Sequence, residues 1–199
     1  MIDRLIDYLR ARMALEPRHE ALVRSLMKAK QVRKGEMLQR AGDRVQYGYF
    51  VARGCLRKFL IDDKGREHIL QFAPENWWLV ETTALREGQP ARFFFEALED
   101  SDLVLTEWPA HDRFMVEIPG YAEAFGIGVQ RQSAAREQRV LDVMSTTAEE
   151  RYLKFLDTYP SIVLRVPQHM LASYLGITPE TLSRVRARVG GRRSERRPT

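Results

Sequence analysis

The chain has 199 residues, 44% of them hydrophobic and 30% charged, with a net charge of +5, which is ordinary for one large or two small globular domains. No apolar run approaches the roughly 18 residues of a membrane span, and the acidic start is unlike a secretory signal, so we expect a cytoplasmic protein with no membrane partner. The single cysteine, Cys55, excludes an internal disulfide and a cluster held by four thiolates, and the scattered histidines predict no metal site.

The first thirty residues are predicted to be helical. Leu5, Ile6 and Leu9 form one apolar stripe, and Pro17 marks the first turn of a second helix. The residues expected to face inward on this second helix are Ala21, Leu22, Leu26 and Met27.

From Gln31 onward, turn signals recur at intervals of roughly ten residues, with short apolar stretches between them. The predicted strands are 36–39, 47–52, 55–61, 67–72, 93–98 and 103–108. Many short antiparallel strands indicate a jelly roll or β-roll, and the fold class is therefore α+β. The segment Val80–Pro90 is predicted to carry a helical turn and a loop.

A long helix is predicted over residues 119–144, and Thr147 is placed to cap a further helix over residues 148–159. The long helix carries an apolar stripe, which we interpret as the seam of a homodimer. The seam residues are Phe125, Val129, Val140 and Val143. The alternative is that this stripe packs only against its own β-roll.

The stretch 167–188 predicts two short helices joined by a tight turn. Gly176 occupies the position where a helix ends in a left-handed residue, Thr178 is an N-cap, and Pro179 stands at the first helical position. The second helix has an apolar inner side and a polar outer side, which is typical of a helix-turn-helix whose outer side meets DNA. The predicted DNA-contacting residues are Thr178, Glu180, Thr181, Ser183, Arg184 and Arg188.

The positive charge of the chain lies at this end. Residues 161–199 hold eight arginines and two acids, whereas residues 1–160 are close to neutral. A basic helix followed by a basic tail is the pattern expected where DNA phosphates are neutralised.

A jelly roll, a long helix and a C-terminal helix-turn-helix together resemble the Crp/Fnr family of bacterial transcription regulators. The most specific segments are 34–43, 49–54 and 171–184. The resemblance implies a β-roll sensor domain with N-terminal helices over residues 1–118, a dimerisation helix over 119–144 and a winged helix-turn-helix over 145–199. It implies double-stranded DNA as a partner, and it admits RNA polymerase and a small-molecule effector as further partners.

The resemblance also assigns roles within the recognition helix and the β-roll. Glu180 and Arg184 match the family's base-reading pair, and Pro179 stands where the family often has an arginine. In the β-roll, the family's cyclic-nucleotide phosphate cassette is degenerate. Its matching positions are Glu81, Gly88, Gln89 and Arg92, with Ala91 at the place of the phosphate-pairing arginine. We therefore expect no cofactor, with cyclic nucleotide as the alternative if a bulge turns Arg92 inward.

Competing functions differ in what they require. A ligand-binding β-roll that has lost DNA binding is the first alternative to a DNA-binding regulator. An enzyme of the cupin type would need clustered histidines, and no nucleophile–base pair is apparent, so we predict no enzymatic activity. A haem sensor would have to use His68 as axial ligand.

Overall fold

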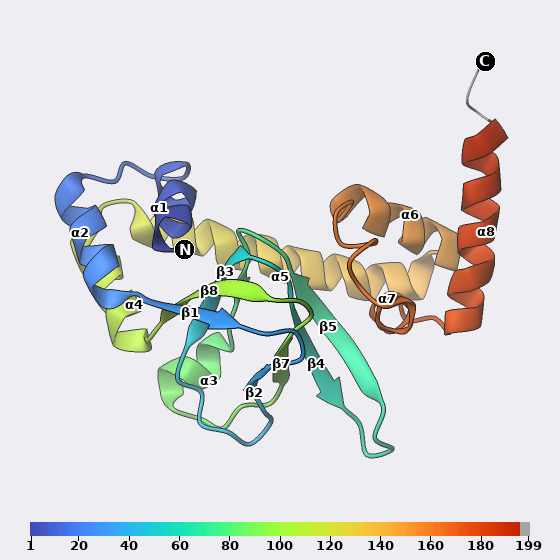
Figure 1. The fold of residues 1–199 in the computed structure, drawn as a ribbon, viewed down its shortest axis with the longest axis horizontal. Coiled ribbons are helices and arrows are strands. Elements are labelled where there is room, and N and C mark those ends of the chain that lie inside the picture. Colours follow the sequence, from blue (N-terminus) through green and yellow to red (C-terminus); the bar gives the residue numbers. More distant parts are fainter. Residues whose placement is uncertain (196–199) are drawn as a thin grey trace. The chain divides into compact units, whose positions relative to one another are not determined.

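The computed structural model describes the backbone of residues 1–195 and the side chains through residue 190. Its contacts group the chain into two compact units (Figure 1). The first contains residues 1–60 and 70–131, and the second contains residues 61–69 and the chain from residue 132. The division into a sensor domain (1–118), a dimerisation helix (119–144) and a DNA-binding domain (145–199) stays a prediction.

The β-roll consists of two four-stranded sheets, in the orders β1-β8-β3-β6 and β2-β7-β4-β5 (Figure 1). Pairing is antiparallel between β1 and β8, β2 and β7, β3 and β6, β3 and β8, and β4 and β7. Fully buried side chains of both sheets, among them Val51, Leu56 and Phe95, fill the space between them. The predicted jelly-roll class is confirmed. The strands are β1 Lys28–Val32, β2 Met37–Gln39, β3 Gly48–Arg53, β4 Leu56–Ile61, β5 Glu67–Ala73, β6 Trp78–Leu79, β7 Phe94–Ala97 and β8 Ser101–Thr106.

Three helices cover one side of this roll, namely α1 (Ile2–Arg10), α2 (Pro17–Leu26) and α4 (Trp108–Glu117). Of these, α1 and α2 were predicted. The stripe of Leu5, Ile6 and Leu9 is buried as expected. Of the residues expected to face inward on the second helix, Met27 is buried and Leu22 and Leu26 pack against the core, whereas Ala21 is exposed. Val23, which was not predicted to face inward, is also buried.

Three elements differ from the sequence prediction, and one of them is the short strand β6 (Trp78–Leu79), which was not among the predicted strands. Residues 28–30 belong to strand β1 rather than to a helix, and Trp108 begins helix α4 (Trp108–Glu117) rather than ending a strand. Four of the five residues of β1 are exposed, so its sequence carries little apolar pattern and its conformation comes from pairing with β8. Helix α4 has Pro109 in its first turn and buries Ala110 and Phe114, which is a helical signal that the strand interpretation overlooked.

The turn between β3 and β4 depends on Gly54. This residue has φ +98°, and a Cβ placed on it would lie 2.8 Å from the Cα of Ser101. Only glycine accommodates both the dihedral angle and the approach of the β8 backbone.

The second unit is helical. It contains the later part of α5 (Tyr121–Ser145), α6 (Ala148–Thr158), α7 (Gln168–Leu175) and α8 (Pro179–Glu195), together with the end of the β4–β5 hairpin. The predicted cap at Thr147 is confirmed: its hydroxyl accepts from the Glu150 N–H at 3.2 Å, and the Glu150 carboxylate accepts from the Thr147 N–H at 2.8 Å. From residue 132 to residue 195 the described chain holds helices and connecting turns, so strands of the predicted wing are not among these residues.

Candidate nucleic-acid interface and β-roll site

The turn between α7 and α8 is built as the sequence predicts. Gly176 has φ +67°, and the N–H groups of Gly176 and Ile177 donate to the carbonyls of Ser173 and Ala172 at 3.2 and 3.0 Å. The Thr178 hydroxyl accepts from the Thr181 N–H at 3.2 Å, which caps α8. Ala172 is buried where the two helices cross, and Leu182, Val185 and Val189 form the buried side of α8.

The outer side of α8 presents polar groups to solvent. Glu180, Ser183 and Arg184 are exposed, and the Arg184 guanidinium donates to the Thr181 hydroxyl at 3.2 Å. Its own backbone N–H, the Thr178 hydroxyl and the charge of Arg184 together lower the pKa of Glu180, so this carboxylate is ionised at neutral pH. An anionic acceptor and a cationic donor one helical turn apart can meet base edges of opposite character.

Arg188 lies on the same helix but has a partner within the chain. Its guanidinium is 3.3 Å from the carboxylate of Glu149, in the first turn of α6. Arg184 and Arg188 border a cleft of about 490 Å³ between α6 and α8. Arg186 is half-buried. The tail arginines at 192, 193, 196 and 197, predicted to contact phosphate, lie outside the residues whose side chains the structure describes.

Glu81 is the best-defined residue of the β-roll site, and its carboxylate accepts hydrogen bonds from other residues of the chain. It is buried at the start of α3 (Thr82–Glu87), the helical turn expected in this segment. One oxygen accepts from the Gln39 side-chain amide at 2.8 Å and from the Phe93 N–H at 3.0 Å, and the other accepts from the Arg92 N–H at 3.1 Å. The carboxylate thus pins the chain at residues 92 and 93, just before β7, to the start of α3.

The other predicted ligand residues do not converge on Glu81. Gly88 ends α3 in a left-handed conformation at φ +65°, and the exposed Gln89 side chain donates to the Glu87 carboxylate at 3.0 Å. The Arg92 side chain is exposed and its guanidinium lies 5.5 Å from the Phe93 ring centroid. Ala91, predicted from the resemblance to stand at the place of the phosphate-pairing arginine, is buried in a small apolar cluster with Val45 and Ala84.

Two of the buried polar side chains in the β-roll that sequence reasoning missed lie near the predicted ligand residues. Gln39 is buried against Glu81, and Lys58 of β4 is buried with its ammonium 4.0 Å from the Phe93 ring centroid. A polar residue inside a predicted strand was the available signal in both cases.

The four residues of the predicted dimer seam on α5 differ in exposure. Phe125 is half-buried within the first unit, where its ring centroid lies 4.3 Å from that of His111. Val129, Val140 and Val143 are 46%, 60% and 45% exposed. The same helix also exposes three apolar residues that were not assigned to the seam, namely Ile127, Leu141 and Met144.

Within the part of the chain that the structure describes, no helix is long and apolar enough to cross a membrane. Nor do the described residues place three or more histidine, cysteine, aspartate or glutamate side chains where one metal ion could be held.

Comparison with known proteins agrees with this geometry. The family model of the cyclic nucleotide-binding domain matches residues 29–116. The transcriptional regulatory protein btr of Bordetella pertussis is 27% identical over 170 residues, covering 80% of this chain and 69% of that protein. The transcriptional activator Anr of Pseudomonas protegens is 25% identical over 177 residues, covering 83% and 72%.

The fold has a counterpart in a solved structure. FixK2 from Bradyrhizobium japonicum superposes with a TM-score of 0.73 and 21% identity, over 83% of this chain and 85% of that one. A β-roll that matches the cyclic nucleotide-binding domain, a helix-turn-helix beyond it, and relatives named as transcriptional regulators make this chain similar to transcription regulators of the Crp/Fnr type.

Proposed function

We propose that this protein is a sequence-specific DNA-binding transcription regulator that acts in the cytoplasm as a homodimer and has no catalytic role. The observation that carries this proposal is the exposed pair of Glu180 and Arg184 on α8, behind a turn held by Gly176 and a cap at Thr178. A recognition helix presents such groups to the major groove, where arginine pairs with guanine and glutamate accepts from cytosine.

Arg184→Ala should weaken specific DNA binding by about 5-fold to 150-fold, which corresponds to the roughly 1–3 kcal/mol of one base contact. It should also relax specificity at one base pair of the site. The measurement is fluorescence anisotropy with a selected DNA site and its single-base variants at fixed salt.

Arg186→Ala is the matched control, because Arg186 is half-buried and two positions further along the helix. It removes the same charge, so a pure charge effect would make the two variants equal for specific and random DNA. That equality would contradict base reading by Arg184. If the unmutated protein shows no salt-dependent binding to DNA, the alternative function is favoured, namely a ligand-binding β-roll that has lost DNA binding.

We further propose that the β-roll does not respond to cyclic AMP. This rests on the buried Ala91 at the place of the phosphate-pairing arginine and on the three donors that already occupy the Glu81 carboxylate. A ligand that bound the folded state would raise the melting temperature by mass action. Cyclic AMP at millimolar concentration should therefore change neither the melting temperature nor the DNA affinity. Calorimetric binding with micromolar affinity would contradict this expectation.

A further inference from the structure

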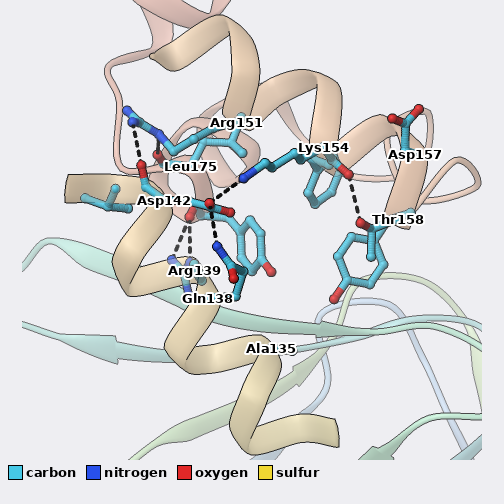
Figure 2. A pocket seen from close by; sticks show the side chains of 13 residues that line it. Ala135, Gln138, Arg139, Asp142, Arg151, Lys154, Asp157, Thr158 and Leu175 are labelled. Atoms are coloured by element: carbon cyan, nitrogen blue, oxygen red, sulfur yellow. Dashed lines mark hydrogen bonds and ion pairs between the residues drawn. The ribbon is translucent and has the colours of Figure 1, made fainter. Parts of the chain in front are cut away.

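A cleft in the second unit shares one residue, Val143 of the predicted dimer seam, with the functions proposed above. It lies between α5, α6 and the end of α7 and has a volume of about 540 Å³, within the range of roughly 300–1,000 Å³ typical of small-molecule sites (Figure 2). None of the predicted DNA-contacting residues lines it. Its lining combines aromatic rings, three cationic side chains and two carboxylates.

The aromatic wall consists of Phe155, Tyr159 and Tyr174. The centroid of Phe155 lies 5.2 Å from that of Tyr159 and 5.4 Å from that of Tyr174, and the two tyrosine rings are 6.4 Å apart and perpendicular. Flat side chains at these spacings offer both faces and edges to a planar guest.

The charged groups of the cleft are held in place by helix ends. The Arg151 guanidinium donates to the carbonyls of Leu175 at 2.9 Å and Asp142 at 3.3 Å, and also to that of Thr146. These carbonyls belong to the last turns of α5 and α7, where a cation is favoured. Among the described residues only carbonyl oxygens accept from Arg151, so its charge has no carboxylate in direct contact.

Two other cations lie nearby. Lys154 reaches from α6 to the Asp142 carboxylate of α5 at 2.5 Å, as Figure 2 shows. The Arg139 guanidinium lies 4.1 Å from the Tyr174 ring centroid and donates to the Tyr174 carbonyl at 3.0 Å. Asp157 of α6 also lines the cleft, so the lining carries three cations and two acids.

We propose that this cleft binds a small planar organic anion. The aromatic wall takes the flat body, and the side of the cleft formed by Arg151 and Lys154 takes the negative charge. An anion is preferred to a cation because the lining has one positive charge in excess and because Arg151 lacks a direct carboxylate partner. This site is separate from the β-roll pocket and from the outer face of α8.

The experiment uses 2-naphthoate as the probe and the full chain without DNA, so its outcome does not depend on DNA binding. A ligand of this size bound with ordinary efficiency should show a Kd of about 1 mM or tighter by calorimetry or protein-observed NMR. Two matched probes separate the contributions. The neutral 2-naphthamide lacks the charge and cyclohexanecarboxylate lacks the flat ring, and each should bind at least about threefold more weakly.

Two substitutions locate the site. Ala135→Trp places an indole in the cleft and should weaken 2-naphthoate binding at least tenfold, whereas Ala134→Trp makes the same change at the neighbouring exposed position, which does not line the cleft. Asp157→Asn removes an exposed negative charge from the lining and should strengthen binding by about 1.5-fold to fivefold.

Four outcomes would overturn the proposal: no binding of 2-naphthoate at 10 mM, equal binding of 2-naphthamide, binding that survives Ala135→Trp in a folded protein, or weaker binding in Asp157→Asn. If Ala135→Trp fails to fold, the Asp157→Asn comparison still decides, because it tests the sign of the charge the cleft prefers.

Discussion

Val140→Glu should dissociate the proposed dimer and abolish specific DNA binding while leaving both units folded. Val140 is 60% exposed on α5, so the substitution creates no cavity and leaves the charge in water in the separated subunit. In a two-fold dimer the helix would meet its own copy, and two carboxylates would face each other in an apolar seam with Val129 and Met144. Losing the second helix-turn-helix removes the avidity of paired half-sites, which is worth about 10² to 10⁴ in affinity.

Ala134→Glu is the control for this prediction. It adds the same charge to an exposed residue of the same helix, 120° around the helix axis from Val140. Sedimentation should show a dimer for Ala134→Glu and for the unmutated protein, and a monomer for Val140→Glu. A dimer should select an inverted repeat with half-sites about 34 Å apart. A monomeric unmutated protein at tens of micromolar, or a selected site without inverted symmetry, would rule out the dimer.

Glu81→Ala should destabilise the first unit rather than change the affinity for any ligand. The substitution removes an acceptor from three donors: the Gln39 amide, which keeps its bond to the Phe93 carbonyl at 3.0 Å, and the part-buried N–H groups of Arg92 and Phe93. At about 1 kcal/mol for each hydrogen bond lost, the free energy of unfolding should fall by about 3 kcal/mol. For a domain of this size the melting temperature should drop by roughly 10 °C.

Thermal and urea denaturation of Glu81→Ala measure this effect, and Glu87→Ala is its control. Glu87 is the last residue of α3, the helix that begins directly after Glu81. Its carboxylate is exposed and, among the described residues, is paired only with the neighbouring Arg86 and Gln89 side chains. Its substitution should change the stability by less than about 0.5 kcal/mol. A Glu81→Ala protein as stable as the unmutated one would show that the carboxylate does not hold the chain at residues 92 and 93, and would return Glu81 to the candidates for ligand binding.

The helix-turn-helix is predictable from the sequence because its signals are local. A left-handed glycine at 176, a hydroxyl cap at 178 and a proline at 179 each act within one turn of the chain, so neighbouring residues suffice to place them. The same holds for the cap at Thr147. For a similar reason, turn signals placed six of the eight strands of the β-roll to within a few residues, namely β2, β3, β4, β5, β7 and β8.

The elements that escaped prediction owe their conformation to distant residues. Strand β1 exposes four of its five side chains and exists because β8 offers it hydrogen bonds. The role of Glu81 depends on three donors, contributed by Gln39 and by residues 92 and 93. A motif alignment identifies Glu81 but contains nothing about which donors reach it.

The seam prediction shows a limit of periodicity. Phe125 and Val143 lie at the same angle on α5, yet Phe125 packs against His111 of its own chain and Val143 is nearly half exposed. An apolar stripe indicates that a face is covered, but not whether its own chain or a second copy covers it. The Val140→Glu experiment addresses this distinction.

The pairing of β1 with β8 has a consequence for how the protein is made. Lys28 pairs with Leu105 and Val32 with Ser101, so the sheet stays incomplete until β8 has left the ribosome. At a synthesis rate of about 5–20 residues per second, roughly 4–15 s pass between the synthesis of β1 and that of its partner β8. Strand β3, which pairs with the other edge of β8, also stays without this partner until β8 is made. By contrast, α6, α7 and α8 are consecutive in the chain and pack on one another. The nascent β-roll, rather than the helical unit, is therefore the part exposed to mispairing and to chaperones during synthesis.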